Sequence, residues 1–183
     1  MEKDIEKVLI NESRIKDEVK KLAKKIAIDY KQKNLTIISI LNGSLIFLSD
    51  LIRLLTFPVK IDTIRVNAYI GGVTSPKKEI EIINEIRLDI KGEHVLIVDD
   101  ILDTGRTLAK IKQIIEKHNP LSIRVCTFLN KPARREMNIV PDYCCFEIED
   151  NFVVGYGLDF DNKYRNLPYI GVLKENCYNH KGK

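Results

Sequence analysis

The stretch Val95-Leu-Ile-Val-Asp-Asp-Ile-Leu-Asp-Thr104, continued by Gly105-Arg106-Thr107-Leu108, decides how this chain folds. Its four consecutive apolar residues, Val95 to Val98, predict a central strand that is buried on both faces. Apolar residues then recur at the spacing of a helix, at Leu108, Ile111, Ile114 and Ile115. A buried strand, a polar turn and a helix in this order are typical of α/β folds, in which ligands bind beyond the carboxyl ends of the strands.

The polar turn combines acidic residues with groups that bind anions. Asp99 and Asp100 follow the predicted strand, and Asp103 comes directly before a threonine. Free N–H groups at the start of a helix, together with the hydroxyls of Thr104 and Thr107, can hold a phosphate. The carboxylates of Asp99 and Asp100 would repel a phosphate, and they suit hydroxyl groups or a metal ion. A ligand with a phosphate at one end and a diol beside it is a ribose phosphate.

Composition places the chain among ordinary globular proteins. Its 183 residues are enough for one domain with a sizeable core. Lys and Arg number 30 against 26 Asp and Glu, and the net charge of +4 suits a small anionic substrate as well as weak nucleic-acid contact. The four cysteines lack C-x-x-C spacing, so we expect free thiols in a reducing compartment. The polar N-terminus and the lack of an apolar run of ~20 residues predict a cytoplasmic protein that does not contact membranes.

Strands alternate with helices along the chain. Helices are predicted from an Asn11 cap to about Lys31, at about Leu45–Leu55 and after the turn at 104–107. Strands are predicted at Leu35–Leu41, Lys60–Tyr69, Ile80–Ile86, Ser122–Leu129, Tyr143–Ile148 and Phe152–Gly155, with an irregular tail of roughly 25 residues after them. Residues 71–78, Gly-Gly-Val-Thr-Ser-Pro-Lys-Lys, predict a long mobile loop. The alternation predicts one α/β domain over residues 1–183, with a mainly parallel central sheet flanked by helices.

Residues 95 to 108 resemble the signature of the type I phosphoribosyltransferases, an apolar strand followed by (Asp/Glu)-Asp-x-x-Asp-Thr-Gly-x-Thr. The resemblance implies that family's fold, with a small hood formed by the terminal segments and by the mobile loop. It implies that Asp99 and Asp100 bind the ribose hydroxyls, directly or through Mg²⁺, and that Asp103 is the catalytic base at N7 of a purine. The 5-phosphate of phosphoribosyl pyrophosphate would be held by Thr104, Gly105, Arg106 and Thr107.

Three further segments are similar to the branch of this family that acts on 6-oxopurines. Leu41-Asn42-Gly43-Ser44 resembles the pyrophosphate loop, with Asn42 where a basic residue is common. Ser44 would add a donor to the bound anion. Asn130-Lys131-Pro132 resembles Asp-Lys-Pro, whose lysine would donate to the purine O6. The mobile loop usually follows a Ser-Tyr pair, which is Ala68-Tyr69 here, and Tyr69 would close over the reaction centre.

The third segment, Phe152-Val-Val-Gly-Tyr-Gly-Leu-Asp-Phe160, is nearly as specific as the signature. The resemblance implies that Phe152 stacks on the purine ring and that the Val153 backbone hydrogen-bonds to the edge of that ring. Asp159 would hold Mg²⁺, as would Asp100, and Arg165 would contact pyrophosphate. Together these segments imply a purine salvage enzyme that transfers 5-phosphoribosyl to N9 of hypoxanthine and guanine, giving IMP or GMP and pyrophosphate, as a homodimer or homotetramer with Mg²⁺.

Three alternatives remain open. Val-Leu-Ile-Val-Asp-Asp also opens phosphorylation receiver domains, but here about half of the chain precedes it. A regulator that keeps the fold and binds RNA or DNA is compatible with Lys77-Lys78 and the lysine-rich first helix. The modest charge and the presence of Asp103 argue against it, so nucleic acid is not the expected partner. A specialist for xanthine and guanine is the nearest alternative, because the sequence does not fix what faces the purine C2.

Overall fold

The computed structural model describes residues 1–70 and 78–178, without the side chains of residues 67–70, 78 and 79. Its centre is a six-stranded sheet, in which only β4 runs antiparallel to its neighbour. Across this sheet the strands are β4 (Lys78–Ile82), β3 (Lys60–Ile70), β2 (Leu35–Leu41), β5 (His94–Leu102), β6 (Ser122–Asn130) and β7 (Tyr143–Glu147). The helices are α1 (Glu12–Asp29), α2 (Leu45–Leu54), α3 (Arg106–Glu116) and α4 (Glu175–Tyr178), with 3₁₀ turns η1 (Glu2–Asp4) and η2 (Pro132–Arg134). The predicted α/β fold with a mainly parallel sheet is confirmed.

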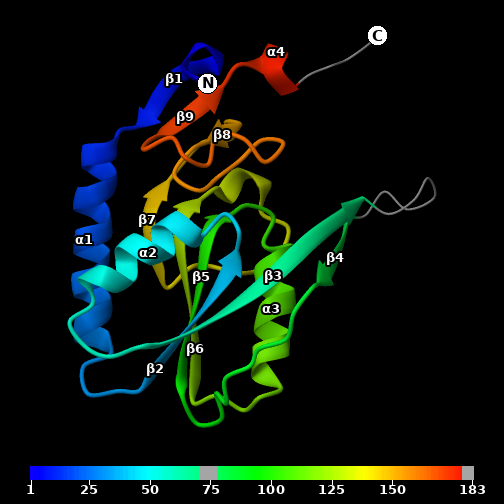
Figure 1. Cartoon of the computed structure of the whole chain (residues 1–183). Coiled ribbons are helices and arrows are strands. Elements are labelled where there is room, and N and C mark those ends of the chain that lie inside the picture. Colours follow the sequence, from blue (N-terminus) through cyan, green and yellow to red (C-terminus); the bar gives the residue numbers. More distant parts are fainter. Residues whose placement is uncertain (71–77, 179–183) are drawn as a thin grey trace.

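The central strand β5 serves two core clusters, one on each face of the sheet. Leu96 and Val98 pack in a cluster with residues of α1 and α2, whereas Val95 and Ile97 pack in a cluster with residues of α3. Successive side chains of a strand point to opposite faces, so a run of four apolar residues supplies both clusters. Figure 1 shows α1 and α2 on one side of the sheet and α3 on the other.

The helices begin where their sequence signals predict. The Asn11 side chain accepts a hydrogen bond from the Arg14 backbone N–H at 2.9 Å and caps α1. α1 ends at Asp29, two residues before the predicted end at Lys31. α2 also ends one residue earlier than predicted, which is within the usual fraying of helix ends.

The signature strand is longer than predicted. β5 extends to Leu102, so Asp99 and Asp100 lie inside the strand instead of following it. The reason is that pairing with β6 continues beyond the apolar run, from Asp99 opposite Thr127 to Leu102 opposite Asn130.

By contrast, β4 is shorter than the predicted strand, which ran to Ile86. The Asn84 side chain takes the place of further strand pairing with β3. It accepts a hydrogen bond from the Arg65 N–H and donates one to the Thr63 carbonyl, both at 2.7 Å. A side-chain amide that binds backbone groups in this way ends a strand without leaving those groups unpaired.

A second sheet of three strands joins the two ends of the chain and forms the hood at the top of Figure 1. Its order is β1 (Ile5–Ile10), β9 (Ile170–Leu173) and β8 (Val153–Val154). The prediction of an irregular tail after Gly155 is therefore wrong, since β9 and α4 lie within it, and β1 was not predicted. β9 has four residues and its partner lies at the other end of the chain, so no local pattern marks the pair.

The predicted mobile loop falls almost entirely outside the described residues, and so does the side chain of Tyr69. Within the described ranges, no helix is both long and apolar enough to cross a membrane.

The hood meets the large sheet at Gly157. The Gly157 backbone has a φ of +102°, and a Cβ there would lie 2.1 Å from the carbonyl oxygen of Gly43 in the β2–α2 turn. The Gly157 N–H donates to the Arg165 carbonyl at 2.9 Å. Glycine alone combines this φ with so close an approach, so the residue holds the segment after β8 against the β2–α2 turn.

Gly157→Ala should destabilise the protein by more than a left-handed φ alone costs, which is about 1–3 kcal/mol. The excess comes from the clash with the Gly43 carbonyl. Gly92→Ala is the matched control, because Gly92 has a φ of +69° and nothing lies within 4 Å of an added Cβ. Free energies of unfolding in urea measure both losses, and equal losses would contradict the close contact.

Candidate active site

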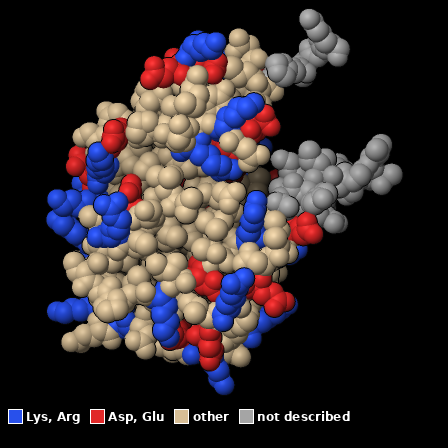
Figure 2. All heavy atoms as spheres, in the orientation of Figure 1, with Lys and Arg blue, Asp and Glu red and all other residues tan. Residues whose placement is uncertain are grey.

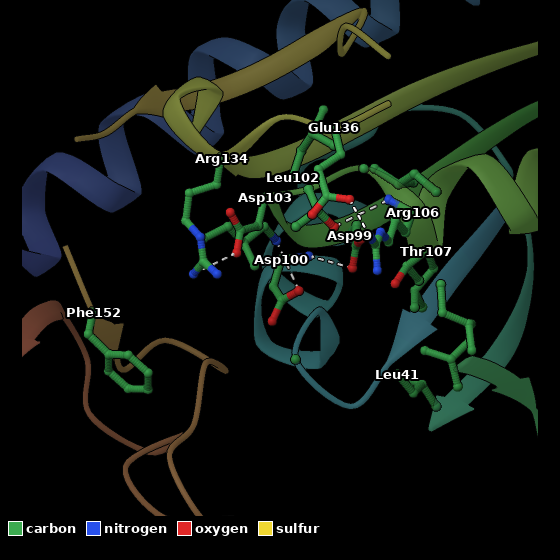
Figure 3. A pocket seen from close by; sticks show the side chains of 18 residues that line it. Leu41, Asp99, Asp100, Leu102, Asp103, Arg106, Thr107, Arg134, Glu136 and Phe152 are labelled. Atoms are coloured by element: carbon green, nitrogen blue, oxygen red, sulfur yellow. Dashed lines mark hydrogen bonds and ion pairs between the residues drawn. The ribbon is translucent and has the colours of Figure 1, made fainter. Parts of the chain in front are cut away.

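The carboxyl ends of β2 and β5 open into a cavity of about 690 Å³. The signature residues from Asp99 to Leu108 line it, together with Leu41 and Gly43 from the β2–α2 turn and Phe152 from the hood. In Figure 3 the acidic and basic side chains of the signature gather on one side of the cavity, and Phe152 lies on a separate segment across from them. The cavity therefore lies where parallel sheets bind ligands.

Two adjacent carboxylates, Asp99 buried and Asp100 half-buried, lie at the base of the cavity. The Asp99 carboxylate accepts a hydrogen bond from the Asp100 N–H at 3.0 Å, and that of Asp100 accepts from the Ile101 N–H at 2.9 Å. Asp99 is only 6% exposed, and burial, with repulsion from Asp100, raises its pKa well above the ordinary value. Burial also raises the pKa of Asp100. Hydroxyl donors or a cation would relieve the cost of burying this pair.

The β2–α2 turn lies directly against one of these acids. A Cβ on Gly43 would lie 1.7 Å from Oδ2 of Asp100, so any other residue would displace that carboxylate. The peptide bond between Leu41 and Asn42 is cis. The predicted pyrophosphate loop and the predicted ribose and metal acids are thus neighbours.

Ser44, however, does not offer its hydroxyl to the cavity as the sequence led us to expect. Ser44 is fully buried, its hydroxyl lies 2.7 Å from that of Ser39, and it donates to the Ile40 carbonyl. This hydroxyl therefore fastens the turn to β2, and backbone groups are left as the turn's donors to an anion.

The predicted phosphate turn lies at the start of α3. Gly105 caps the helix with a φ of +84°, and a Cβ there would touch Cβ of Met137 at 3.2 Å. The side chain of Thr104 accepts a long hydrogen bond of 3.4 Å from the Arg106 N–H, and the Arg106 guanidinium pairs with Glu136. Because all four residues from Thr104 to Thr107 line the cavity, the positive end of α3 faces it.

Asp103 has one carboxylate oxygen paired and one without a partner. Its Oδ2 lies 3.4 Å from the Arg134 guanidinium, whereas its Oδ1 is buried with no hydrogen-bond partner among the described residues. A buried acceptor without a donor is costly in a folded protein. This oxygen is thus suited to accept a proton or a hydrogen bond from a ligand.

The predicted purine-binding residues are only partly brought together. Phe152 lines the cavity, is 38% exposed and stacks on Tyr178 with ring centroids 4.5 Å apart. Lys131 is 5% exposed, and its ammonium contacts the Asp150 carboxylate at 2.7 Å and the Asn151 carbonyl at 3.0 Å. Neither Lys131 nor the buried Val153 is among the residues that line the cavity.

Asp159 and Arg165, which the resemblance assigns to magnesium and pyrophosphate, are paired with each other. Their charged groups lie 2.7 Å apart, and Arg165 also donates to the Gly157 carbonyl at 2.8 Å. Neither residue lines the cavity. This ion pair must open before either side chain can bind a ligand of its own.

Sequence reasoning missed Arg134, Arg135 and Glu136, which contact the signature residues from the segment after β6. A run of charged residues immediately after the carboxyl end of a parallel strand was the available signal.

The buried pair also fits a magnesium ion. Among the described residues there is no group of three or more His, Cys, Asp or Glu side chains that could hold a metal by themselves. Mg²⁺ is usually bound by one or two carboxylates together with waters and substrate phosphates. Adjacent buried carboxylates beside an anion site match that preference.

Asp99→Asn should stabilise the protein increasingly as the pH rises from about 4 to about 8. The folded pKa of Asp99 is raised, so the stability that its neutral form contributes is complete below the unfolded pKa and is lost as the pH rises through the folded pKa. Asparagine stays neutral and avoids that loss. Thermal midpoints across this pH range test the prediction, with Asp89→Asn as the exposed control, and a difference that does not grow with pH would contradict it.

Comparison with known proteins agrees with this geometry. The phosphoribosyl transferase domain model matches residues 8–161. A hypoxanthine-guanine phosphoribosyltransferase from Streptococcus pneumoniae is 43% identical over 178 residues, which cover 97% of this chain and 98% of that protein.

Solved structures agree as well. A hypoxanthine phosphoribosyltransferase from Staphylococcus aureus has a TM-score of 0.92 at 40% identity, covering 97% of this chain and 96% of its own. A hypoxanthine-guanine phosphoribosyltransferase from Bacillus anthracis has a TM-score of 0.85 at 36% identity, covering 93% and 98%. The chain therefore belongs to the phosphoribosyltransferase family, in its hypoxanthine-guanine branch.

Proposed function

We propose that this phosphoribosyltransferase moves the 5-phosphoribosyl group of phosphoribosyl pyrophosphate onto N9 of hypoxanthine and guanine. The products are IMP or GMP and pyrophosphate, and the reaction depends on Mg²⁺. The observation that carries the proposal is one cavity that joins a buried carboxylate pair to the N-terminal end of a helix. A phosphate and a neighbouring diol are the chemistry that this combination recognises.

The sugar phosphate is oriented by the signature residues. Thr104, Gly105, Arg106 and Thr107 hold the 5-phosphate through backbone N–H groups and hydroxyls at the start of α3. Asp99 and Asp100 face the ribose hydroxyls, which supply the donors that two buried carboxylates need. Held at both ends, the sugar presents its anomeric carbon to the rest of the cavity.

Pyrophosphate departs from that carbon on the side of the β2–α2 turn. Backbone N–H groups of Leu41 to Ser44 and the guanidinium of Arg165 bind it, once Arg165 has left Asp159. Asp100 and Asp159 are the residues that would hold magnesium. When bound, the ion neutralises charge on the pyrophosphate and acts as a Lewis acid.

The purine is bound from the hood and from the end of β6. Phe152 stacks on the ring, the Val153 backbone bonds its edge, and Lys131 donates to O6. An ammonium has three donors, and Lys131 uses two of them on Asp150 and Asn151, so one is left for the base.

Proton transfer falls to Asp103. As N9 forms its bond to the anomeric carbon, the purine loses the proton at N7, and the unpartnered Oδ1 of Asp103 accepts it. Arg134 holds the other oxygen and fixes the direction of the carboxylate. The loop that follows Tyr69 would close over these groups and exclude water during turnover.

The proposal extends to assembly and location. The exposed face of α2 carries Leu45, Ile46 and Leu54, which are 53%, 38% and 41% exposed, and Figure 2 shows a broad area without charged side chains across the middle of the visible face. Exposed apolar side chains such as Leu45, Ile46 and Leu54 favour burial against a second subunit, as in a homodimer or homotetramer. The free cysteines suit the reducing cytoplasm.

Asp103→Asn tests the proposed chemistry. Asparagine keeps the shape and the contact with Arg134 but cannot take a proton, so IMP formation should fall by ~10²–10⁴-fold while binding of phosphoribosyl pyrophosphate stays close to wild type. Steady-state kinetics and calorimetric titration measure the two quantities. Asp89→Asn, outside the cavity, should leave both unchanged. A variant that forms IMP at the wild-type rate would remove Asp103 from the role of base.

A further inference from the structure

The guanidinium of Arg135 lies behind the signature turn, with its donors bound to backbone carbonyls. Nε donates to the Asp103 carbonyl at 2.9 Å, and Nη1 donates to that of Ile139. Nη2 donates both to the Leu102 carbonyl at 3.1 Å and to Oδ1 of Asn130 at 2.6 Å. Arg135 does not line the cavity. It therefore acts on the shape of the site and does not touch a ligand there.

The neighbours of Arg135 extend this attachment by one residue. The N–H groups of Glu136 and Met137 both donate to the Thr104 carbonyl, at 3.0 and 3.1 Å. Three successive carbonyls, those of residues 102 to 104, are thus bound by the segment after β6. The dihedral angles of these residues decide where the Asp103 carboxylate and the first N–H groups of α3 point. Fixing their carbonyls fixes both groups.

Asn130 holds Arg135 from the other side and links it to Glu147. Asn130 is the register partner of Leu102 in β5 and of Glu147 in β7, so the three residues form a row across the sheet. Its Nδ2 donates to the Glu147 carboxylate at 3.1 Å while its Oδ1 accepts from Arg135. An amide has both a donor and an acceptor, whereas an aspartate here would bring two carboxylates together. This explains why Asn130 replaces the acid that the resemblance led us to expect.

We propose that Arg135 is a positioning residue that holds the Asp103 backbone and the phosphate turn in their reactive geometry, and that Asn130 and Glu147 hold Arg135. The role of Asp103 as a base rests on the proposed function. The attachment of the turn is independent of that function, because it is argued only from contacts within the chain. A planar guanidinium is required, since a lysine ammonium cannot reach several carbonyls in one plane.

Arg135→Lys tests the proposal with the charge retained. Hydrogen exchange of the Glu136 and Met137 amides, which donate to the Thr104 carbonyl, should become roughly tenfold faster in the ligand-free protein, because the turn opens locally. The value of kcat for IMP formation should fall by ~10–100-fold, which is the usual cost of removing the support of a reacting group. Arg124→Lys is the matched control: at the other end of β6 its guanidinium binds Asp29 at 3.0 Å and Tyr143 at 2.6 Å. It should change stability without changing the exchange of the Glu136 and Met137 amides.

Unchanged exchange in Arg135→Lys would overturn the proposal, as would the same acceleration in Arg124→Lys. If the wild-type protein converts none of the purines, the proposed function fails, yet the exchange measurement still decides whether Arg135 holds the turn.

A second variant tests the row that Leu102, Asn130 and Glu147 form across the sheet. Asn130→Asp should lower the thermal midpoint, and adding Glu147→Gln should restore it, because the glutamine amide can donate to the new carboxylate. A double variant no more stable than the single one would remove Asn130 and Glu147 from the proposal.

Discussion

The close packing of two adjacent carboxylates, Asp99 buried and Asp100 half-buried, at the end of the central strand is the constraint on which the rest of the site depends. Asp99 and Asp100 lie within β5 because its pairing with β6 continues past the apolar run. Asp100 occupies the space that a Cβ of Gly43 would need, and Gly43 in turn accepts the close approach of Gly157 from the hood. One series of close contacts therefore joins the sheet, the β2–α2 turn and the hood. The raised pKa values of both acids mark the cost of this arrangement, which a bound cation or diol would offset.

Charged groups around the cavity are mutually paired in a way that suits a phosphorylated substrate. Arg165 pairs with Asp159, Arg134 with Asp103, and Arg106 with Glu136. Phosphate oxygens would compete for Arg165, and the Asp159 carboxylate released in this way becomes available to magnesium. Substrate binding and the release of Asp159 are then the same event. Partly exposed pairs of this kind contribute little to stability, so exchanging their partners costs little.

Much of this structure could be predicted from the sequence because its signals are local. The apolar run at Val95 to Val98 predicted the central strand, and the Asn11 cap predicted where α1 begins. The pairing of β1 with β9 could not be predicted, since it joins the two ends of the chain and has no local pattern. The signature predicted residues that line the cavity, from Asp99 to Thr107, whereas Lys131, Asp159 and Arg165 belong to motifs but do not line it. The contacts of Ser44 and Arg135 could not be predicted, because a hydroxyl or a guanidinium gives no sign in sequence of which carbonyl it binds.

The central claim is that this site transfers phosphoribosyl groups to 6-oxopurines. The most direct test measures nucleotide formation from phosphoribosyl pyrophosphate and Mg²⁺ with hypoxanthine, guanine, xanthine, adenine and uracil in parallel. We expect IMP and GMP to form and adenine to remain unchanged, because the proposed donor Lys131 needs an oxygen at the purine 6-position. Uracil, which is not a purine, should also remain unchanged. Nucleotide formation from xanthine but not from hypoxanthine would instead identify the specialist for xanthine and guanine. If the folded protein forms no nucleotide with any of the five bases, the claim is contradicted.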